Sequence, residues 1–411
     1  MLMRAVAAAV SLAFAPLTLA QQQVIRPPIA TYWVDASTIS GMGAGMTGGG
    51  MAGMMGRMMG GGGGAQKTLD LRLGSSQAAS SAPQAQHDIP PGMNMGPSLP
   101  LVTPSQARAE SGLPGGMEQP KGKLLIYWGC GEKAGAGQPV VIDFASVAAG
   151  RAPNLGSRRI NAPDGPLFGR SKSFGEWPNT QDPRTVPPEA SLRGDHLVKG
   201  NYSPDIRFTV DDRRDFMPAV SVSSSASAAG GRQVKWSSVT GATGYSLVVI
   251  GAREDASEMV MWSSSAVQEM PAALLGFIPP AEVARLVREK VVLPAEATQC
   301  TVPQEVMASS PMPVLQFIAY GDELNVVHPP RPQDPKVAWE QQYAVKVRLK
   351  STAMLPLMDG MENMGRMGSR GSTGPGNSQA AGSEPQPQPG FNPVEEGVKE
   401  GVRALRDLFG K

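Results

Sequence analysis

Hydrophobic and polar residues alternate along two segments near the N-terminus. Residues 30–38 (ATYWVDAST) and residues 67–75 (KTLDLRLGS) both repeat with a period of two and contain aromatic or branched side chains. This pattern predicts half-buried β-strands. The stretch between them, residues 41–64, is almost entirely glycine and methionine. Because so long a loop is either functional or disordered, we predict two neighbouring strands joined by a disordered Met/Gly insert.

Three further segments of the N-terminal half carry strand patterning. Residues 121–133 (KGKLLIYWGCGEK) and 138–147 (QPVVIDFASV) are rich in branched and aromatic side chains, and residues 196–210 (HLVKGNYSPDIRFTV) resume the pattern after a stretch rich in proline and glycine. Such punctuation favours turns and irregular connections. We predict that residues 24–217 form a β-rich, sandwich-like region with long irregular insertions.

The C-terminal half has more regularly spaced strand signals. Short runs of β-forming residues alternate with turn residues, which is typical of an antiparallel sandwich. One short helix is predicted at residues 279–290 (PPAEVARLVREK), where proline begins the segment and Val283 and Leu286 share one face. The predicted strands are residues 218–225, 232–239, 244–252, 258–265, 297–302, 313–321 and 343–351.

Both ends of the chain differ from this β-rich middle. Residues 1–20 combine Arg4 with an apolar run that ends in small residues at Ala20, the pattern of a secretory signal peptide. Residues 353–391 return to methionine, glycine, proline and glutamine, and we predict a disordered linker there. In residues 392–411 apolar side chains recur at spacings of three and four, which predicts a C-terminal amphipathic helix.

Charge and composition exclude some classes of partner. Lysine and arginine total 37 and aspartate and glutamate 35, with both signs scattered, so the chain lacks the basic surface that nucleic acid requires. Glycine (49 residues) and proline (38 residues) favour short strands and turns over a helical enzyme. After the signal peptide no apolar run has the length of a transmembrane helix. We expect a periplasmic or secreted protein of the cell envelope.

The chain has two cysteines, Cys130 and Cys300. In an oxidising compartment they can form one disulfide. Two separately buried thiols, each packed as a small apolar group, are the alternative. Spacing alone does not decide between them.

The stretch VKWSSVTGATGYSLVV (residues 234–249) resembles the second-strand to third-strand region of a fibronectin type III domain. Trp236 and Tyr245 match the family's two core aromatic positions, and residues 241–244 match the turn between them. The resemblance implies a sandwich over residues 218–352, from which the helical insertion departs. The whole chain also resembles exported bacterial envelope proteins of uncharacterised function.

Methionine clusters are the main candidate metal ligands. Thioether sulfur is a soft ligand that suits Cu(I). His87, Met93 and Met95 form a second candidate cluster, and methionines beyond residue 353 form a third. The alternative is that methionine only fills space in glycine-rich loops, where ordering the chain around an ion is costly. The candidate ligands in the insert are Met51, Met54, Met55, Met58 and Met59.

Catalytic motifs are absent from the sequence. The histidines are His87, His196 and His328, and neither His196 nor His328 has a partner at metal-ligand spacing. No nucleotide-binding glycine motif, zinc motif or nucleophile elbow occurs. Cys130 has no base nearby in the sequence, which favours a structural cysteine. We therefore expect no catalytic residues and no cofactor, with copper as the alternative.

Tryptophans offer a third hypothesis, because exposed aromatic rings can stack on sugars. Trp33 and Trp128 lie in predicted strands and are expected in the core, whereas Trp177 in FGEWPN is the better candidate for exposure. We expect a non-enzymatic binding or scaffolding protein that contacts an envelope partner through its C-terminal helix. Soft-metal binding and carbohydrate or surface-polymer binding are the alternatives.

Overall fold

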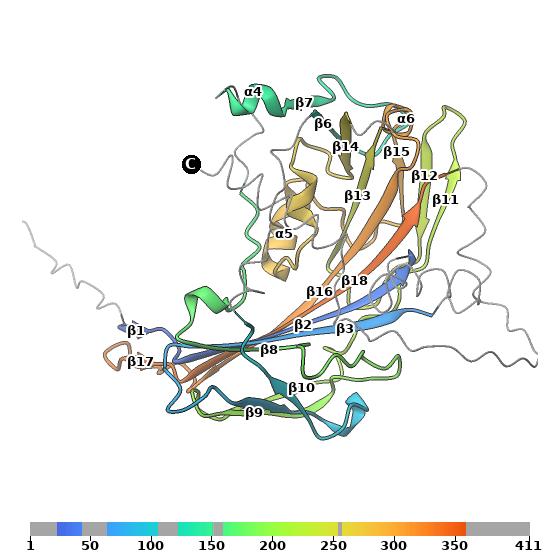
Figure 1. Ribbon diagram of the computed structural model, residues 1–411. Helices are drawn as coiled ribbons and strands as arrows, with labels where there is room; N and C mark the ends of the chain where they lie inside the picture. Colours follow the sequence, from blue (N-terminus) through green and yellow to red (C-terminus); the bar gives the residue numbers. More distant parts are fainter. Residues whose placement is uncertain are drawn as a thin grey trace, which may run out of the picture.

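The computed structural model describes residues 23–42, 64–105, 122–149, 151, 159–253 and 257–358. Within these ranges the chain is mainly β, and its strands pair mostly antiparallel. A nine-stranded sheet is accompanied by sheets of four, three and two strands (Figure 1). The mainly β fold predicted from the strand patterning is confirmed.

The nine-stranded sheet is the centre of the molecule. Its longest strands have 15 and 14 residues, so at about 3.3 Å per residue each extends about 45–50 Å. Neighbours pair antiparallel except β18 with β2 and β14 with β6, which are parallel. In spatial order the strands are β7 (Val140–Asp143), β6 (Lys123–Trp128), β14 (Glu258–Ser263), β13 (Gly244–Ala252), β16 (Val314–His328), β18 (Tyr343–Pro356), β2 (Ala30–Gly41), β3 (Gln66–Ser75) and β8 (Ser173–Trp177).

β2 and β3 confirm the two strands predicted on either side of the Met/Gly insert. They pair antiparallel from Ala30 opposite Ser75 to Ile39 opposite Gln66. β6 confirms the strand predicted within residues 121–133, and it pairs antiparallel with β7. The strand predicted at residues 138–147 is confirmed only in part, because the helix α4 (Phe144–Ala148) replaces its second half. Alternation was sufficient to find β2 and β3, although β2 is buried on both faces rather than half-buried as predicted. β6 is apolar on both faces and was found as a short run of branched and aromatic residues.

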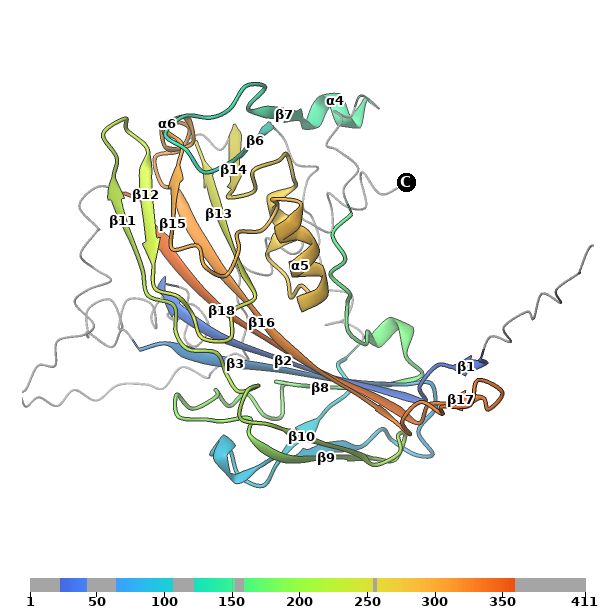
Figure 2. The same ribbon diagram turned by 180° about the vertical axis from the view of Figure 1, so that it is seen from behind.

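Two smaller sheets cover one face of the central sheet, as the two opposite views show (Figures 1 and 2). The four-stranded sheet consists of β10 (Ile206–Val210), β9 (Gly194–Gly200), β4 (Ala85–Asp88) and β5 (Ser98–Leu101). The three-stranded sheet consists of β11 (Val222–Ala226), β12 (Arg232–Trp236) and β15 (Gln299–Val302). We call the covered side the apolar face; its buried side chains include Tyr32, Val34, Leu71, Leu73, Tyr245 and Phe317.

The opposite side, which we call the polar face, carries charged residues on β2, β3 and β18 and apolar residues on β13 and β16. α5 (Pro280–Arg288) packs over the apolar part, where Val283 and Leu286 are buried with Val248 and Ile318. This helix confirms the one predicted at residues 279–290. Proline suits its start because the first helical N–H would be unpaired, and the basic last turn suits the helix dipole.

The central sheet corrects the predicted boundary between residues 217 and 218. β18, from the C-terminal half, pairs with β2, from the N-terminal half, over twelve consecutive residue pairs from Tyr343–Ala30 to Met354–Gly41. The two sandwich-like regions therefore share one sheet. Local patterning could not reveal this, because it identifies strands but not the strands with which they pair.

β18 also corrects the start of the predicted linker at residue 353. Ala353, Met354 and Leu355 continue the strand and pair with β16, and Met354 is buried. The remaining predicted linker, the signal peptide 1–20, almost all of the insert 41–64 and the C-terminal helix 392–411 lie outside the described residues.

Short elements complete the described fold. None of the helices in the described ranges has the length and hydropathy that a membrane crossing requires. A parallel two-stranded sheet at one tip consists of β1 (Ile25–Arg26) and β17 (Trp339–Glu340). The short helices are η1 (Pro91–Met93), α4 (Phe144–Ala148), η2 (Phe168–Arg170), η3 (Pro271–Leu274) and α6 (Gln304–Ala308).

Candidate functional site

A buried charge cluster lies on the polar face, where β3, β2 and β18 are neighbours. It consists of Asp35, Arg72 and Arg348. Arg348 donates to Asp35 through Nε at 2.6 Å and Nη2 at 2.5 Å, and Arg72 donates to the same carboxylate. Burial by itself raises the pKa of Asp35, but the hydrogen bonds and charges of the two arginines outweigh it and hold the pKa below its ordinary value. Asp35 is therefore ionised at neutral pH.

Aromatic rings fix the guanidinium group of Arg348 in this cluster. The Cζ atom of Arg348 lies 4.3 Å from the ring centroid of Trp33 and 4.6 Å from that of Phe277. Nη1 of Arg348 donates to the carbonyl of Pro163 at 3.0 Å. With two rings, a carboxylate and a carbonyl around it, the group is held in one orientation.

A pocket of about 300 Å³ opens beside this cluster. Trp33 forms part of its wall, and residues 164–171 form another part. A Cβ atom on Gly165 would lie 3.0 Å from the Trp33 ring and 2.9 Å from Cζ of Arg72, so only glycine lets this segment approach so closely. The pocket wall is therefore braced by the charge cluster. Its polar lining consists of Thr31, Ser75, Ser76, Asp164, Arg170 and Ser171.

The serine hydroxyls of the pocket donate their protons to backbone carbonyls. Ser75 and Ser76 donate to the carbonyl of Ile29 at 3.3 and 3.1 Å, and Ser171 donates to the carbonyl of Leu167 at 3.0 Å. A hydroxyl that has donated its proton still accepts. Arg170 is exposed, and no carboxylate in the described part of the chain lies within ion-pair distance of it. The wall thus offers hydroxyl acceptors together with one cation, Arg170, and one carboxylate, Asp164.

A second buried polar group lies on the apolar face, between the central and four-stranded sheets. Tyr32 Oη lies 2.8 Å from His87 Nδ1, His87 Nε2 lies 2.9 Å from His196 Nδ1, and His196 Nε2 lies 2.7 Å from the carbonyl oxygen of Leu192. The three side chains are at most 3% exposed. We call this row of hydrogen bonds the histidine chain. Sequence spacing missed it, because 109 residues separate the two histidines.

The pKa values of both histidines are lowered. Burial is the main cause for His87, and the neighbouring His196 adds to it, so the pKa falls well below its ordinary value of 6.5. Burial also lowers the pKa of His196, against the opposing effects of the Leu192 carbonyl and Asp195. Both rings are therefore neutral at pH 7. Phe208 stacks on His196 with ring centroids 4.6 Å apart.

The two cysteines are joined in the structure. Cys130, just after β6, and Cys300, in β15, form a disulfide with Cα atoms 5.2 Å apart. β6 belongs to the central sheet and β15 to the three-stranded sheet. The bond therefore ties the two layers together across 170 residues of sequence.

The candidate metal ligands are placed in two different ways. The five methionines of the insert lie outside the described residues, so the copper hypothesis for them stays a prediction. In the second cluster, Met93 and Met95 are buried in the hydrophobic core and both ring nitrogens of His87 are hydrogen-bonded, which leaves no soft-metal site there. No group of three or more His, Cys, Asp or Glu side chains within the described ranges is arranged to hold a metal ion.

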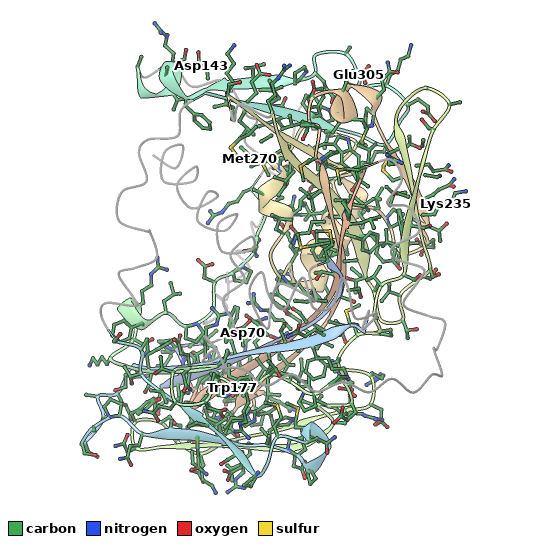
Figure 3. All side chains as sticks on the ribbon, turned by 45° about the vertical axis from the view of Figure 1, so that its right-hand side comes forward. Asp70, Asp143, Trp177, Lys235, Met270 and Glu305 are labelled. Atoms are coloured by element: carbon green, nitrogen blue, oxygen red, sulfur yellow. A yellow bond between two sulfur atoms is a disulfide. The ribbon has the colours of Figure 1, made fainter. Side chains whose placement is uncertain are left out.

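Trp177 corrects the prediction of an exposed tryptophan. It ends β8, which pairs with β3, and only 2% of it is exposed. Figure 3 shows it among the packed side chains of the lower layer. Glycine and proline around it suggested a loop, but β8 is a short edge strand that ends where Pro178 begins. Trp33 is buried as expected, and Trp128 is half-buried.

The resemblance to fibronectin type III stays a prediction. Trp236 and Tyr245 do pack together, with ring centroids 5.7 Å apart in an edge-to-face arrangement. Other sandwiches also pack aromatic pairs in this way. No protein-family model, curated protein or solved structure matches the chain.

Proposed function

We propose that this protein is an exported, non-enzymatic binding module of the cell envelope. Its binding site is the pocket beside Trp33, and its ligand is an acidic, hydroxyl-rich sugar of a surface polymer. The braced pocket wall is the observation that carries the proposal, because a binding site needs its groups held in place by their surroundings. Trp33 replaces Trp177 as the aromatic residue of the site.

The chemistry of the pocket supports this ligand class. Ser76 and Ser171 donate their protons to backbone carbonyls and can accept from sugar hydroxyls. Arg170 can pair with a carboxylate. Pro28, Ile29 and Pro166 supply apolar surface for the C–H face of a sugar ring. Such a mixed lining around a small volume is typical of ligand sites.

Binding to immobilised acidic and neutral oligosaccharides tests the proposal. We expect retention of acidic sugars by the native protein and a loss of at least 10-fold in affinity for Arg170→Ala. Lys172→Ala is the matched control. It also removes one positive charge, and Lys172 lies two residues from Arg170, but its side chain does not line the pocket. Equal binding by the two variants, or no retention of any acidic sugar, would contradict the proposal.

A further inference from the structure

The histidine chain has a fixed direction of proton donation. A backbone carbonyl only accepts, so the Leu192 oxygen requires the proton of His196 to be on Nε2. His196 Nδ1 is then an acceptor, which requires the proton of His87 to be on Nε2 as well. His87 Nδ1 is left to accept from the hydroxyl of Tyr32. One carbonyl thus determines the tautomers of two imidazoles and the direction of one phenol.

This arrangement has no position for an additional proton. A proton on His196 Nδ1 would face the N–H of His87 across 2.9 Å. A proton on His87 Nδ1 would face Tyr32, whose hydroxyl would then have to turn away and lose its present hydrogen bond. Either protonation also places a charge among buried rings, next to Phe208. Acid therefore opposes the closed arrangement twice, by geometry and by desolvation.

The histidine chain also joins two separate layers of the fold. Tyr32 belongs to β2 of the central sheet, and His87 and His196 belong to β4 and β9 of the four-stranded sheet. We propose that the histidine chain is an acid-sensitive latch that holds the four-stranded sheet on the central sheet and releases it when the two histidines are protonated. The latch is independent of the proposed sugar pocket, which lies on the other face.

Other ionisable groups near the chain do not compensate an added proton. Burial, with a further contribution from Tyr202 in the loop after β9, raises the pKa of Tyr32, and burial raises the pKa of Tyr202, so both phenols stay neutral. Asp195 favours the charged form of His196, but the effect of burial on that histidine is larger. Asp88 pairs with Lys199 at 2.7 Å in a partly exposed ion pair. In the described ranges, no buried carboxylate is hydrogen-bonded to a side chain of the histidine chain.

The sign of the pH effect follows from the lowered pKa values. The opened state takes up protons near the ordinary pKa of 6.5, whereas the closed state takes them up only at lower pH. Closure is therefore fully stabilised above about pH 6.5 and weakens as the pH falls. Each histidine raises the opening constant by up to about 10-fold per pH unit, and the two together by up to about 100-fold.

Hydrogen exchange measured by mass spectrometry between pH 8 and pH 5, corrected for intrinsic exchange rates, tests the latch in the full chain. We expect β4, β9 and β10 to lose protection below pH 6.5, together with increased binding of a hydrophobic dye as the apolar face is uncovered. β13 and β16 should stay protected. Simultaneous loss of protection in the four-stranded and central sheets, or unchanged protection in the four-stranded sheet, would overturn the latch.

Variants separate the latch from general acid unfolding. The triple variant Tyr32→Phe, His87→Phe, His196→Phe keeps three rings and removes every titrating group of the chain, so its four-stranded sheet should stay closed at pH 5. His328→Phe is the control: it removes the third histidine, which is exposed and stacks on Tyr343, and the acid opening should persist. An unchanged opening in the triple variant would overturn the proposal.

Nuclear magnetic resonance of the native protein gives a test that needs no variant. Nitrogen-15 shifts at pH 7.5 should show the Nε2–H tautomer for both His87 and His196. Their titration should have midpoints below 6.5, whereas an Nδ1–H tautomer or a midpoint at or above 6.5 for either residue would overturn the latch. This measurement remains decisive if the triple variant fails to fold.

Discussion

The two faces of β2 carry buried polar groups of opposite character. Asp35 on the polar face is ionised and neutralised by two arginines, with aromatic rings against one of them. Tyr32 on the apolar face belongs to a hydrogen-bonded row in which every member is neutral. Ionised groups depend on an opposite charge, whereas neutral groups depend only on the direction of each hydrogen bond. The comparison predicts different sensitivities to mutation, to acid and to salt.

Removing the carboxylate should produce the largest effect. Asp35→Asn leaves Arg348 and Arg72 without their counter-charge in a buried site, and we expect a loss of about 3–5 kcal/mol in the free energy of unfolding. Urea denaturation at pH 7.5 measures this. A loss below about 1 kcal/mol would mean that solvent screens the cluster despite its burial.

Changing the shape of the cation while keeping its charge should have a smaller effect. Arg348→Lys retains the positive charge but loses the two-pronged contact to Asp35 and the planar group between Trp33 and Phe277. We expect a loss of about 2 kcal/mol in the same assay. If Lys performs as well as Arg, charge alone holds the cluster and geometry is unimportant.

Breaking the histidine chain at Tyr32 should have a weaker effect on stability, and this effect should depend on pH. Tyr32→Phe removes the donor to His87, and we expect a loss of about 1–2 kcal/mol at pH 7.5. If the proposed latch opens in acid, this loss should shrink at pH 5, because the hydrogen bond that Tyr32 donates is absent from the opened state. The Asp35→Asn loss should persist at pH 5, since the lowered pKa of Asp35 preserves its contribution above about 3.8. Equal pH profiles for the two variants would refute the distinction.

An exposed ion pair should contribute least. Arg26 and Glu340 pair at 3.3 Å at the tip of the molecule, with both side chains more than two-thirds exposed. We expect Glu340→Gln to change the free energy of unfolding by about 0.5 kcal/mol or less, and the change should vanish in 0.5 M salt. A larger effect would show that the tip is a more rigid part of the fold than its exposure indicates.

Local patterning succeeded wherever one strand or helix carried its own signal. β2, β3 and α5 were found because alternation, or a proline start with an apolar stripe, is visible within about ten residues. Trp177 was placed wrongly because an edge strand flanked by glycine and proline has the same local composition as a loop. Partners distant in sequence, such as His87 and His196, have no local signal.

The sequence by itself determined that the described chain is mainly β and where most of its strands lie. Strands with one apolar face show a period of two, and strands that are apolar on both faces show short runs of branched and aromatic residues. Only the tertiary structure decided that β18 lies beside β2, which brings Arg348 to Asp35 across 313 residues. It also decided that the four-stranded sheet brings His87 against Tyr32. The physical reason is that strand pairing and layer packing are long-range choices. They depend on the fit of whole faces rather than on the residues of any one segment.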